Sequence, residues 1–388
     1  MPAGCAPSVL PSPVDRHPDA PTRRRPRNPT FKPVTVMSNT LATTQPSATL
    51  ASVSAQPGSC NAARHTSSID LSVIVVSFNT RDLLRRSLQA MQTACSGVSH
   101  EIIVVDNASH DGSADMVANE FAHVKLVRAP HNLGFAAANN LGRQAALGQF
   151  LALINPDAFP EPGALAAAIE RLRQRPLIGM VGGLLTGKGG QLEPSARMFP
   201  SPLNDFLALS GLSAKYARSR FFGRFDRTWA DPMEPANVDW VPGAYCIIRQ
   251  QALDEIGFFD ERFFLYYEEV DLCLRLKKAG YTVAYWPELR ATHWGGESSK
   301  TVGGQTLNTH GKQLTLWRMR SALLYYRKHH GWLAARLASG MEMAWHTLRQ
   351  WRNRQLPAKS GESAATVQTM RRAWAETLGG RVSPPTPW

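Results

Sequence analysis

The amino-acid sequence predicts an α/β fold: a doubly wound, mainly parallel sheet followed by a helical C-terminal extension. Two observations predict it. From residue 71 onward, short apolar runs rich in β-branched residues alternate with segments of helical apolar spacing, as expected when buried parallel strands are joined by crossover helices. Beyond about residue 314 the apolar residues recur mainly at helical spacing, which predicts helices rather than further strands.

Each expected strand is a short run of consecutive apolar residues. Each expected helix is a segment in which apolar residues recur every three or four positions. After the first strand, Leu83, Leu84 and Leu88 recur at helical spacing, and Gly280 ends the last helix of the sheet region. The expected strands are 71–78, 101–105, 124–127, 150–154, 180–185 and 283–286, and the later helices are 111–117, 134–147, 163–173, 250–256 and 268–279. The stretch between about 186 and 237 is expected to be rich in loops.

Composition divides the chain into four parts. Residues 1–69 are rich in Pro, Ser, Thr and Ala and poor in aromatic residues, so we expect them to be disordered, with Met37 as an alternative start. Residues 70–300 form the α/β domain. Residues 301–355 are expected to form a helical, basic, amphipathic extension, and 356–388 a second disordered segment, the tail.

The charge of the 388-residue chain limits its partners. The net charge is +13 at pH 7, and the surplus lies toward both ends, as in the run Arg23, Arg24, Arg25 and Arg27. Basic ends favour polyanions such as membrane phospholipid, lipid-linked phosphate or nucleic acid, and a solvated charged face is the alternative. Because no nucleic-acid motif accompanies the charge, we expect no nucleic-acid partner.

Cysteine usage and hydropathy indicate a cytoplasmic protein. The 5 cysteines are scattered without a CxxC pair, which argues against a zinc site or a disulfide framework and is typical of a reducing compartment. No apolar run reaches the roughly 18 residues that span a bilayer. The N-terminal residues also lack the basic-then-apolar pattern of a secretory signal.

Polar residues follow three of the expected strands, at the point where each strand ends. They are Ser77 and Asn79, then Asp106 and Asn107, then Asn155 and Asp157. Ligands of open α/β sheets bind outside the carboxyl ends of the strands, so these side chains are candidates for one binding site. The alternative for the asparagines is that they cap the helices that follow.

Six sequence blocks resemble the family 2 glycosyltransferases, and the subgroup they resemble most is the bacterial rhamnosyltransferase-like enzymes of cell-surface polysaccharide synthesis. In order, the blocks are LSVIVVSFNT, IIVVDNASHDGS, NLGFAAANN, LINPD, FFLYYEEVDLCLR and THWGGES. The resemblance covers about residues 70–300. It implies a Rossmann-like GT-A domain and an inverting transfer of a sugar, rhamnose by the subgroup, from a nucleotide-diphosphate donor to a glycan or lipid-linked acceptor.

The resemblance also implies how the donor is bound. Asp106 would accept the N3–H of uracil or thymine in a charge-assisted hydrogen bond, so the donor would be UDP- or dTDP-linked. The exposed N–H groups at the start of the Ala-rich helix favour the diphosphate, although a turn closed by a helix cap is an alternative for this segment. The residues expected to contact the donor are Ser77, Phe78, Asn79, Asp106, Asn132, Gly134, Asn139, Asn155 and Asp157.

A divalent cation, Mn²⁺ or Mg²⁺, is expected beside the diphosphate. Asn155-Pro156-Asp157 stands where the family has an Asp-x-Asp motif, with Asn155 in place of the first acid. Asp157 is therefore the expected carboxylate ligand, and His293, which matches a histidine of the family, is the expected second ligand. The alternative for His293 is a histidine that packs beside Trp294.

Glu269 is the expected general base, because the second acid of the family's acidic pair takes the proton of the attacking hydroxyl. Glu268, Glu269 and Asp271 lie within one helical turn, and their mutual repulsion should raise the pKa of at least one of them. Glu268 and Asp271 are expected to contact the acceptor, with support of the helix as the alternative for Asp271. Trp240 and Gly243 are further acceptor candidates, and Trp240 could equally belong to the core.

Two other functions compete with this interpretation. A nucleotide-sugar or carbohydrate-binding module without turnover is the main alternative, since Asn155 and Glu269 depart from the family pattern. A dinucleotide-dependent oxidoreductase is set aside because no GxGxxG follows the first strand. The aromatic and basic residues of 317–354 predict attachment to an anionic membrane surface at the inner face of the cell membrane, or else packing on the domain or at a dimer interface.

Overall fold

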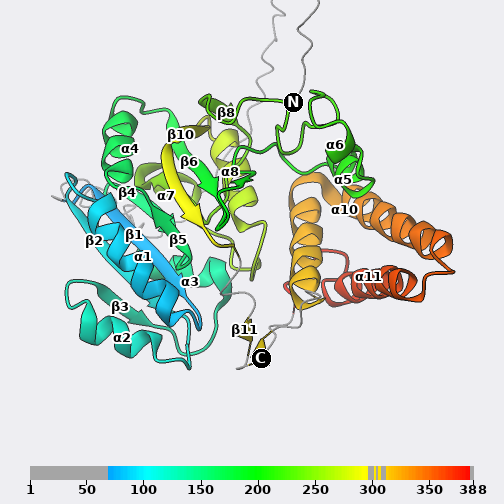
Figure 1. Cartoon of the computed structure of the whole chain (residues 1–388), viewed down its shortest axis with the longest axis horizontal. Helices are drawn as coiled ribbons and strands as arrows, with labels where there is room; N and C mark the ends of the chain where they lie inside the picture. The colour runs from blue at the N-terminus through cyan, green and yellow to red at the C-terminus, as the bar shows by residue number, and fades with distance from the viewer. Residues whose placement is uncertain (1–68, 296–300, 303–304, 307–311, 385–388) are drawn as a thin grey trace, which may run out of the picture. The chain divides into compact units, whose positions relative to one another are not determined.

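The computed structural model describes residues 69–295, 301–302, 305–306 and 312–384. The disordered segment predicted for 1–69 lies outside these residues, except for Ile69. The described residues form the predicted α/β fold with a helical C-terminal region (Figure 1). Within them, every helix is too short or too polar to cross a bilayer.

One large sheet organises the domain, with the strand order β3-β2-β1-β4-β9-β6-β10-β5. Strands β3, β2, β1 and β4 pair in parallel, β9 is antiparallel to both β4 and β6, and β10 is parallel to β6. The sheet is therefore mainly parallel, as predicted. The strands are β1 (Leu71–Ser77), β2 (His100–Asp106), β3 (Lys125–Arg128), β4 (Phe150–Ile154), β5 (Ala158–Pro160), β6 (Ile178–Thr186), β9 (Tyr245–Arg249) and β10 (Thr282–His293), with β7 (Leu192–Glu193) and β8 (Ala236–Val238) at its side and β11 (Thr301–Val302) with β12 (Gln305–Thr306) apart from it.

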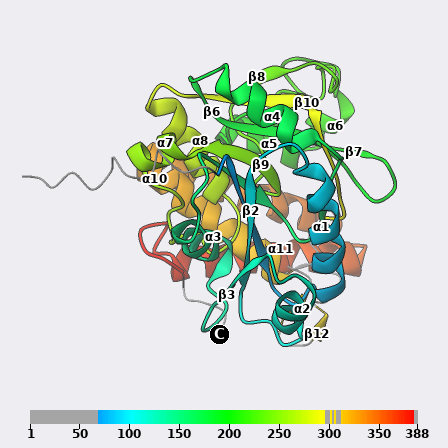
Figure 2. The ribbon, with the colours of Figure 1, turned by 90° about the vertical axis from the view of Figure 1, so that its left-hand side faces the viewer.

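Helices cover both faces of the sheet, because successive strand residues point to opposite sides. Val73 and Val75 pack in a core with α1, α2 and α4, whereas Ile74 packs in a second core with α3, α7, α8 and the C-terminal helices. Figure 2 shows α1 and α3 on opposite sides of the central strands. The helices are α1 (Arg81–Ala94), α2 (Ser113–Glu120), α3 (Gly134–Gln144), α4 (Ala164–Arg173), α5 (Pro202–Leu209), α6 (Leu212–Lys215), α7 (Gln250–Ile256), α8 (Glu268–Lys278), α10 (Lys312–Arg352) and α11 (Pro357–Glu376).

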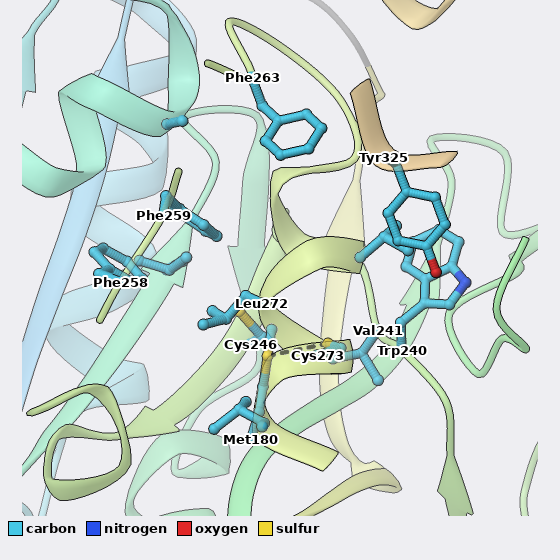
Figure 3. Packing of buried hydrophobic residues seen from close by; sticks show 14 of the residues in the cluster. Met180, Trp240, Val241, Cys246, Phe258, Phe259, Phe263, Leu272, Cys273 and Tyr325 are labelled. Carbon is cyan, nitrogen blue, oxygen red and sulfur yellow. Dashed lines mark hydrogen bonds between the residues drawn. The ribbon is translucent and has the colours of Figure 1, made fainter. Parts of the chain in front are cut away.

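Helix α8 is fixed to the sheet by its apolar face. Leu272 and Cys273 are fully buried, and the thiol of Cys273 lies 3.5 Å from the sulfur of Met180 on β6. Cys246 of β9 and Val241 lie in the same cluster (Figure 3). Glu268 and Glu269 lie one turn before Leu272 and Cys273 on the same side of α8, so this packing also holds the acidic first turn against the sheet.

The C-terminal region differs from the prediction in one respect. Gly331 has φ 81° and interrupts α10. The disordered tail predicted for 356–388 is wrong, because residues 357–376 form α11. Val367, Met370 and Ala373 recur at helical spacing and are buried, so this short apolar stripe is enough to order the segment against α10.

Candidate active site

A cavity of about 340 Å³ lies where β1, β2 and β4 end. Of the residues predicted from the sequence, it is lined by Phe78, Asn132, Gly134, Asn155, Asp157, Gly243, Glu268, Glu269 and His293. Ser77, Asn79, Asp106, Asn139, Trp240 and Asp271 are not part of its lining. Parallel strand ends thus bring most of the predicted residues to one place, as expected for an open α/β sheet.

Asp157 and His293 meet because of strand pairing. His293 ends β10 and stands opposite Ala158 of β5, the residue after Asp157. Nε2 of His293 lies 3.5 Å from Oδ1 of Asp157, and Nδ1 lies 2.8 Å from Oε2 of Glu193. Burial by itself lowers the pKa of His293, but the neighbouring Asp157 and Glu193 outweigh burial and raise that pKa above its ordinary value.

This pair has the chemistry of a divalent-cation site. Nε2 of His293 is buried without a hydrogen bond to any described residue, while a carboxylate on Nδ1 orients the ring, as in many metal-binding histidines. No group of three or more His, Cys, Asp or Glu side chains with metal-site geometry occurs among the described residues. Two protein ligands are typical of a cation that is completed by phosphate oxygens and water.

The backbone at the start of α3 lies in close contact with Phe264. Nδ2 of Asn107 donates to Oδ1 of Asn132 at 2.9 Å, and Oδ1 of Asn107 accepts from the backbone of Leu133 at 2.8 Å. Gly134 has φ 79°, and a Cβ there would lie 2.6 Å from the ring of Phe264. Only glycine fits this position. Asn107, which directly follows β2 and is one of the candidates named from the sequence, lines the cavity and holds this turn.

Several predicted donor residues bond within the protein instead. Ser77 shares a hydrogen bond of 3.0 Å with Thr80. The side chain of Asn79 accepts from the backbone of His110 at 2.8 Å, and Asn139 donates to the carbonyl of Phe135 within α3 at 2.9 Å. These side chains hold the loops behind the cavity.

Asp106 is buried at the end of β2. Its Oδ2 accepts a hydrogen bond of 3.2 Å from the backbone of Ser109, whereas Oδ1 is buried and has no hydrogen-bond partner among the described residues. A buried carboxylate oxygen without a partner is expensive to maintain unless a ligand satisfies it. This is the property expected of a base-recognising carboxylate, although Asp106 itself does not line the cavity.

Glu268 and Glu269 enter the cavity from the first turn of α8. Tyr266 and Tyr267, directly before them, both have φ 69°, a conformation that costs a bulky residue about 1–3 kcal/mol and is typical of functional sites. Oε2 of each glutamate is buried without a hydrogen bond to the described residues. Burial raises the pKa of both carboxyls, and the charge of Glu269 raises the pKa of Glu268 further. The predicted effect of repulsion between the acids is confirmed for Glu268, whereas the raised pKa of Glu269 has burial as its cause.

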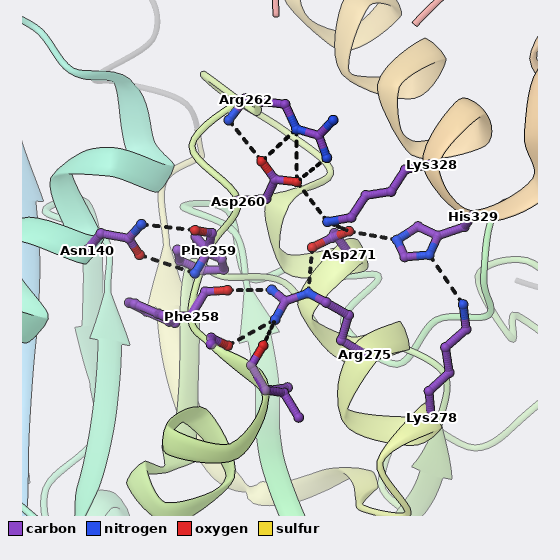
Figure 4. Close-up of polar contacts among 12 residues, drawn as sticks. Asn140, Phe258, Phe259, Asp260, Arg262, Asp271, Arg275, Lys278, Lys328 and His329 are labelled. Carbon is purple, nitrogen blue, oxygen red and sulfur yellow. Dashed lines mark hydrogen bonds and ion pairs between the residues drawn. The ribbon is translucent and has the colours of Figure 1, made fainter. Parts of the chain in front are cut away.

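Asp271 has a different environment, and its predicted contact with an acceptor is not supported. Its side chain is fully buried, with Nε of Arg275 at 2.8 Å from one oxygen and Lys328 Nζ and His329 Nε2 each at 2.6 Å from the other (Figure 4). Burial would raise the pKa of Asp271, but these basic partners lower it below the ordinary value. Asp271 therefore fixes α8 to α10, in agreement with the alternative of a supporting role.

Trp240 and Gly243 flank the acidic turn. The indole N–H of Trp240 donates to the carbonyl of Met198 at 2.8 Å, and the Arg197 guanidinium lies 4.6 Å from its ring centre. Trp240 is thus largely buried, but it lines a second cavity beside the first. A Cβ on Gly243 would lie 3.7 Å from that of Glu269, so Gly243 stands next to the glutamate pair.

Sequence reasoning missed one wall of the cavity. Phe264, Leu265 and Tyr266 precede α8, and Trp317 comes from α10; all four line the cavity. The rings of Phe264 and Trp317 stack with centroids 4.2 Å apart. The aromatic run before α8 was a visible signal, whereas the position of Trp317 depends on how α10 packs, which no local pattern reveals.

The cavity therefore combines two kinds of acidic group. Asp157, with an imidazole beside it, can bind a hard cation and the phosphate oxygens that accompany one. Glu269, with its raised pKa, can take a proton from a hydroxyl group that lies within hydrogen-bonding distance. A phosphate ester and a nucleophilic hydroxyl are the pair of substrates that this arrangement fits.

Two family profiles match the sequence. The profile of glycosyl transferase family 2 matches residues 72–257, and that of glycosyl transferase family group 2 matches residues 213–352. The first match includes Asp106 and Asp157. The second includes the acidic turn, His293 and α10.

The sequence is also similar to characterised proteins. It is 27% identical over 278 residues to the N-acetylglucosaminyl-diphospho-decaprenol L-rhamnosyltransferase of Mycobacterium tuberculosis, covering 69% of this chain and 87% of that protein. It is 30% identical over 90 residues to the rhamnosyltransferase WbbL of Escherichia coli, covering 23% of this chain and 34% of that protein.

Among solved structures, the chain is similar to the mannosyltransferase PcManGT from Pyrobaculum calidifontis in complex with GDP-Man and Mn²⁺, at 16% identity and a TM-score of 0.45 over 81% of this chain and 76% of that one. It is similar to GalNAc-T7 with UDP, GalNAc and Mn²⁺ at 14% identity and a TM-score of 0.47, over 82% and 58% of the two chains.

Proposed function

The chain belongs to glycosyl transferase family 2 and is a glycosyltransferase, and from this premise we propose a specific reaction. The enzyme transfers rhamnose, with inversion, from a dTDP- or UDP-linked donor to a glycan or lipid-linked acceptor in cell-surface polysaccharide synthesis. The observation that carries the proposal is one cavity that contains both the Asp157–His293 pair and the carboxylate of Glu269, whose Oε2 has no hydrogen-bond partner among the described residues.

The donor would be held at the strand ends. Oδ1 of Asp106 is buried without a partner among the described residues and would accept the imide N–H of uracil or thymine. The diphosphate would lie at the start of α3, where Gly134 allows close approach and the helix dipole favours negative charge. The name of the mycobacterial relative supports rhamnose as the sugar.

Asp157 and His293 would hold Mn²⁺ or Mg²⁺. The bound cation would neutralise the negative charge that develops on the diphosphate leaving group. Imidazole as a ligand favours Mn²⁺ over Mg²⁺.

Glu269 would act as general base in a single displacement. The acceptor hydroxyl oxygen forms a bond to the anomeric carbon while the bond from that carbon to the diphosphate oxygen breaks. The hydroxyl proton passes to the carboxylate of Glu269, and the nucleoside diphosphate leaves with the electron pair. One displacement inverts the configuration at the anomeric carbon. Glu268, whose pKa is raised by burial and by the charge of Glu269, would contact the hydroxyls of the acceptor.

A transfer assay with purified protein tests the reaction. We would measure nucleoside diphosphate release with dTDP-rhamnose, UDP-glucose and UDP-N-acetylglucosamine, each with Mn²⁺ and with excess EDTA, using an N-acetylglucosaminyl lipid diphosphate as acceptor. We expect release only with dTDP-rhamnose and Mn²⁺, and an inverted anomeric configuration of the product by NMR. Full activity in EDTA would exclude the metal role, and a retained configuration would exclude the single displacement.

We also propose that the second half of α10 attaches the enzyme to an anionic membrane surface. Trp332, Leu333 and Leu337 after the break at Gly331, and Trp351 near the end of the helix, are each more than half exposed, and exposed arginines lie among them. The expected contribution of residues before Gly331 is corrected: Trp317, Leu323, Tyr325 and Tyr326 are buried in the protein. An amphipathic face of this kind can lie in the headgroup region, where each base contributes about 1 kcal/mol.

Vesicle sedimentation tests the attachment. We expect wild-type protein to sediment with phosphatidylglycerol vesicles but not with phosphatidylcholine vesicles, and raised salt to release it. The double variant Trp332→Gln and Trp351→Gln should stay in the supernatant. Leu177→Gln, which removes a similarly exposed apolar side chain from the loop before β6, should sediment like wild type. Equal sedimentation of the two variants would exclude α10 as the contact.

A further inference from the structure

A second cavity adjoins the first one and is not used by the donor site. It has a volume of about 570 Å³, and residues of α5, α8, α10 and α11 contribute to its lining. The two cavities share Pro242, Tyr266 and Glu269, whereas Asp157 and His293 line only the first. A molecule in the second cavity would therefore reach the carboxylate of Glu269 without occupying the place of the cation and diphosphate.

Much of the lining of the second cavity is apolar, although Asp205, Arg318 and Glu342 also belong to it. The residues that line it come from α8, from both halves of α10 and from neighbouring segments, and include Leu209, Val270, Met319, Leu323, Met341 and Met370. Methionine side chains are unbranched and adapt to irregular apolar ligands. Three methionines around one cavity indicate a flexible, non-polar occupant.

The part next to Glu269 is polar and aromatic. Arg197 lies 4.6 Å from the ring centre of Trp240, and its positive charge acts on Glu269 by lowering the pKa that burial raises. An aromatic ring, a guanidinium and a carboxylate are groups that bind the apolar face and the hydroxyls of a sugar. The two arginines of the cavity already have acidic partners, since Arg197 pairs with Asp226 at 2.5 Å and Arg318 with Glu342 at 2.7 Å.

We propose that this second cavity binds the acceptor as an amphiphilic glycoside. The sugar lies against Arg197, Trp240 and Glu269, and a non-polar aglycone lies among Met319, Met341 and Met370. The inference rests on the proposed function only for the identity of Glu269 as the base; binding of the glycoside can be measured without a donor.

Binding of two probes tests the proposal. They are n-octyl and methyl N-acetyl-β-D-glucosaminide, each titrated into the full-length protein by calorimetry below the critical micelle concentration of the octyl compound. Burial of one methylene group increases affinity by a factor of about four. Three or four buried methylenes of the octyl chain therefore predict a roughly 100-fold tighter dissociation constant than for the methyl glycoside. Equal affinities would overturn the proposal.

A pair of α10 variants locates the octyl chain. Met341 lines the second cavity, and Met343, two residues further along, does not; both side chains are half-buried. Met341→Lys should weaken octyl-glycoside binding at least tenfold, whereas Met343→Lys should bind like wild type. Ala322→Trp, which fills the cavity from the first half of α10, should weaken it as well. Equal loss in Met341→Lys and Met343→Lys would refute the location.

Donor turnover separates this inference from the proposed function. In each variant, a thermal shift with the donor and Mn²⁺ should match wild type, because the first cavity is unchanged. If the octyl glycoside binds in the expected pattern but no donor is turned over, the cavity assignment holds and the proposed reaction fails. If transfer to the octyl glycoside proceeds at the wild-type rate in Met341→Lys, the cavity assignment fails and the proposed reaction holds.

Discussion

Replacing Asp271 by Asn should destabilise the protein without changing the shape of the side chain. Asp271 is fully buried, and three basic groups from Arg275, Lys328 and His329 lie within 2.8 Å of its oxygens. Removal of one partner of a buried ion pair costs about 3–5 kcal/mol, because the remaining charge stays buried. Lys328 and Arg275 are 24% and 18% exposed, so water can solvate part of the charge that is left without its carboxylate. We therefore expect a loss of unfolding free energy at the lower end of this range, about 3 kcal/mol.

Urea denaturation at pH 7 measures the effect, with Asp115→Asn as the control. Asp115 also pairs with an arginine, Arg128, but its side chain is 74% exposed, so its replacement should leave the midpoint unchanged. The reasoning is wrong if the two variants have the same free energy of unfolding. A loss in Asp271→Asn that is accompanied by normal α-helical circular dichroism and slower sugar transfer would agree with a displaced α8.

The pH dependence of the difference in unfolding free energy between wild type and Asp271→Asn provides a second check. The pKa of Asp271 is lowered in the folded protein, so its contribution to stability is complete above the pKa of an unfolded aspartate, about 3.9. That contribution is lost as the pH falls through the lower, folded-state pKa. The difference between wild type and Asp271→Asn should therefore persist from pH 7 to about pH 5 and shrink only in stronger acid. A difference that vanished already at pH 6 would contradict an aspartate as its source.

Four further predictions concern the cavity. Asp157→Ala should abolish transfer and remove the stabilisation of the protein by Mn²⁺ with donor in a thermal shift; retained activity would show that the cation is held elsewhere. Glu269→Gln should lower the transfer rate by at least 100-fold while donor affinity stays within twofold of wild type. Because the base acts as a carboxylate and its pKa is raised, the wild-type rate should rise with pH through a midpoint above that of an ordinary glutamate, about 4.3; a rate that is flat from pH 5 to 8 would speak against this group. Gly134→Ala should weaken donor binding, because its Cβ would lie 2.6 Å from the ring of Phe264; a donor Kd equal to that of wild type would contradict the close approach assigned to this turn.

Most of the fold could be predicted because it depends on local patterns. The apolar runs at 71–78 and 150–154 match β1 and β4, and the break at Gly331 is where φ becomes positive. The short apolar stripe of α11 was missed because Val367 and Met370 are isolated among polar residues. They are buried by contact with α10, and the local sequence around them does not reveal this contact.

The site could be predicted in part, for the same reason. Strand ends converge by topology, so Asp157 was a candidate from its position after β4, whereas Glu269 was a candidate from the family resemblance; both line the cavity. Which neighbours satisfy a polar side chain depends on tertiary packing. Asn139 therefore turned out to bond within α3, and Asp271 to bond to α10, although both had been expected to contact substrate. No pattern in the sequence indicated that the side chain of Trp317 would line the cavity.

The two hydrophobic cores differ in when they can form during synthesis. The core with α1, α2 and α4 uses residues no later than Ala291, whereas the core on the other face also needs Met319 from α10 and Met370 from α11. At about 5–20 residues per second, translation of the C-terminal helices takes several seconds. During that interval the nascent chain can complete one face of its sheet while the other still exposes apolar strand residues. Chaperones that bind exposed apolar residues would therefore contact the nascent chain on the face of the sheet that α8 later covers.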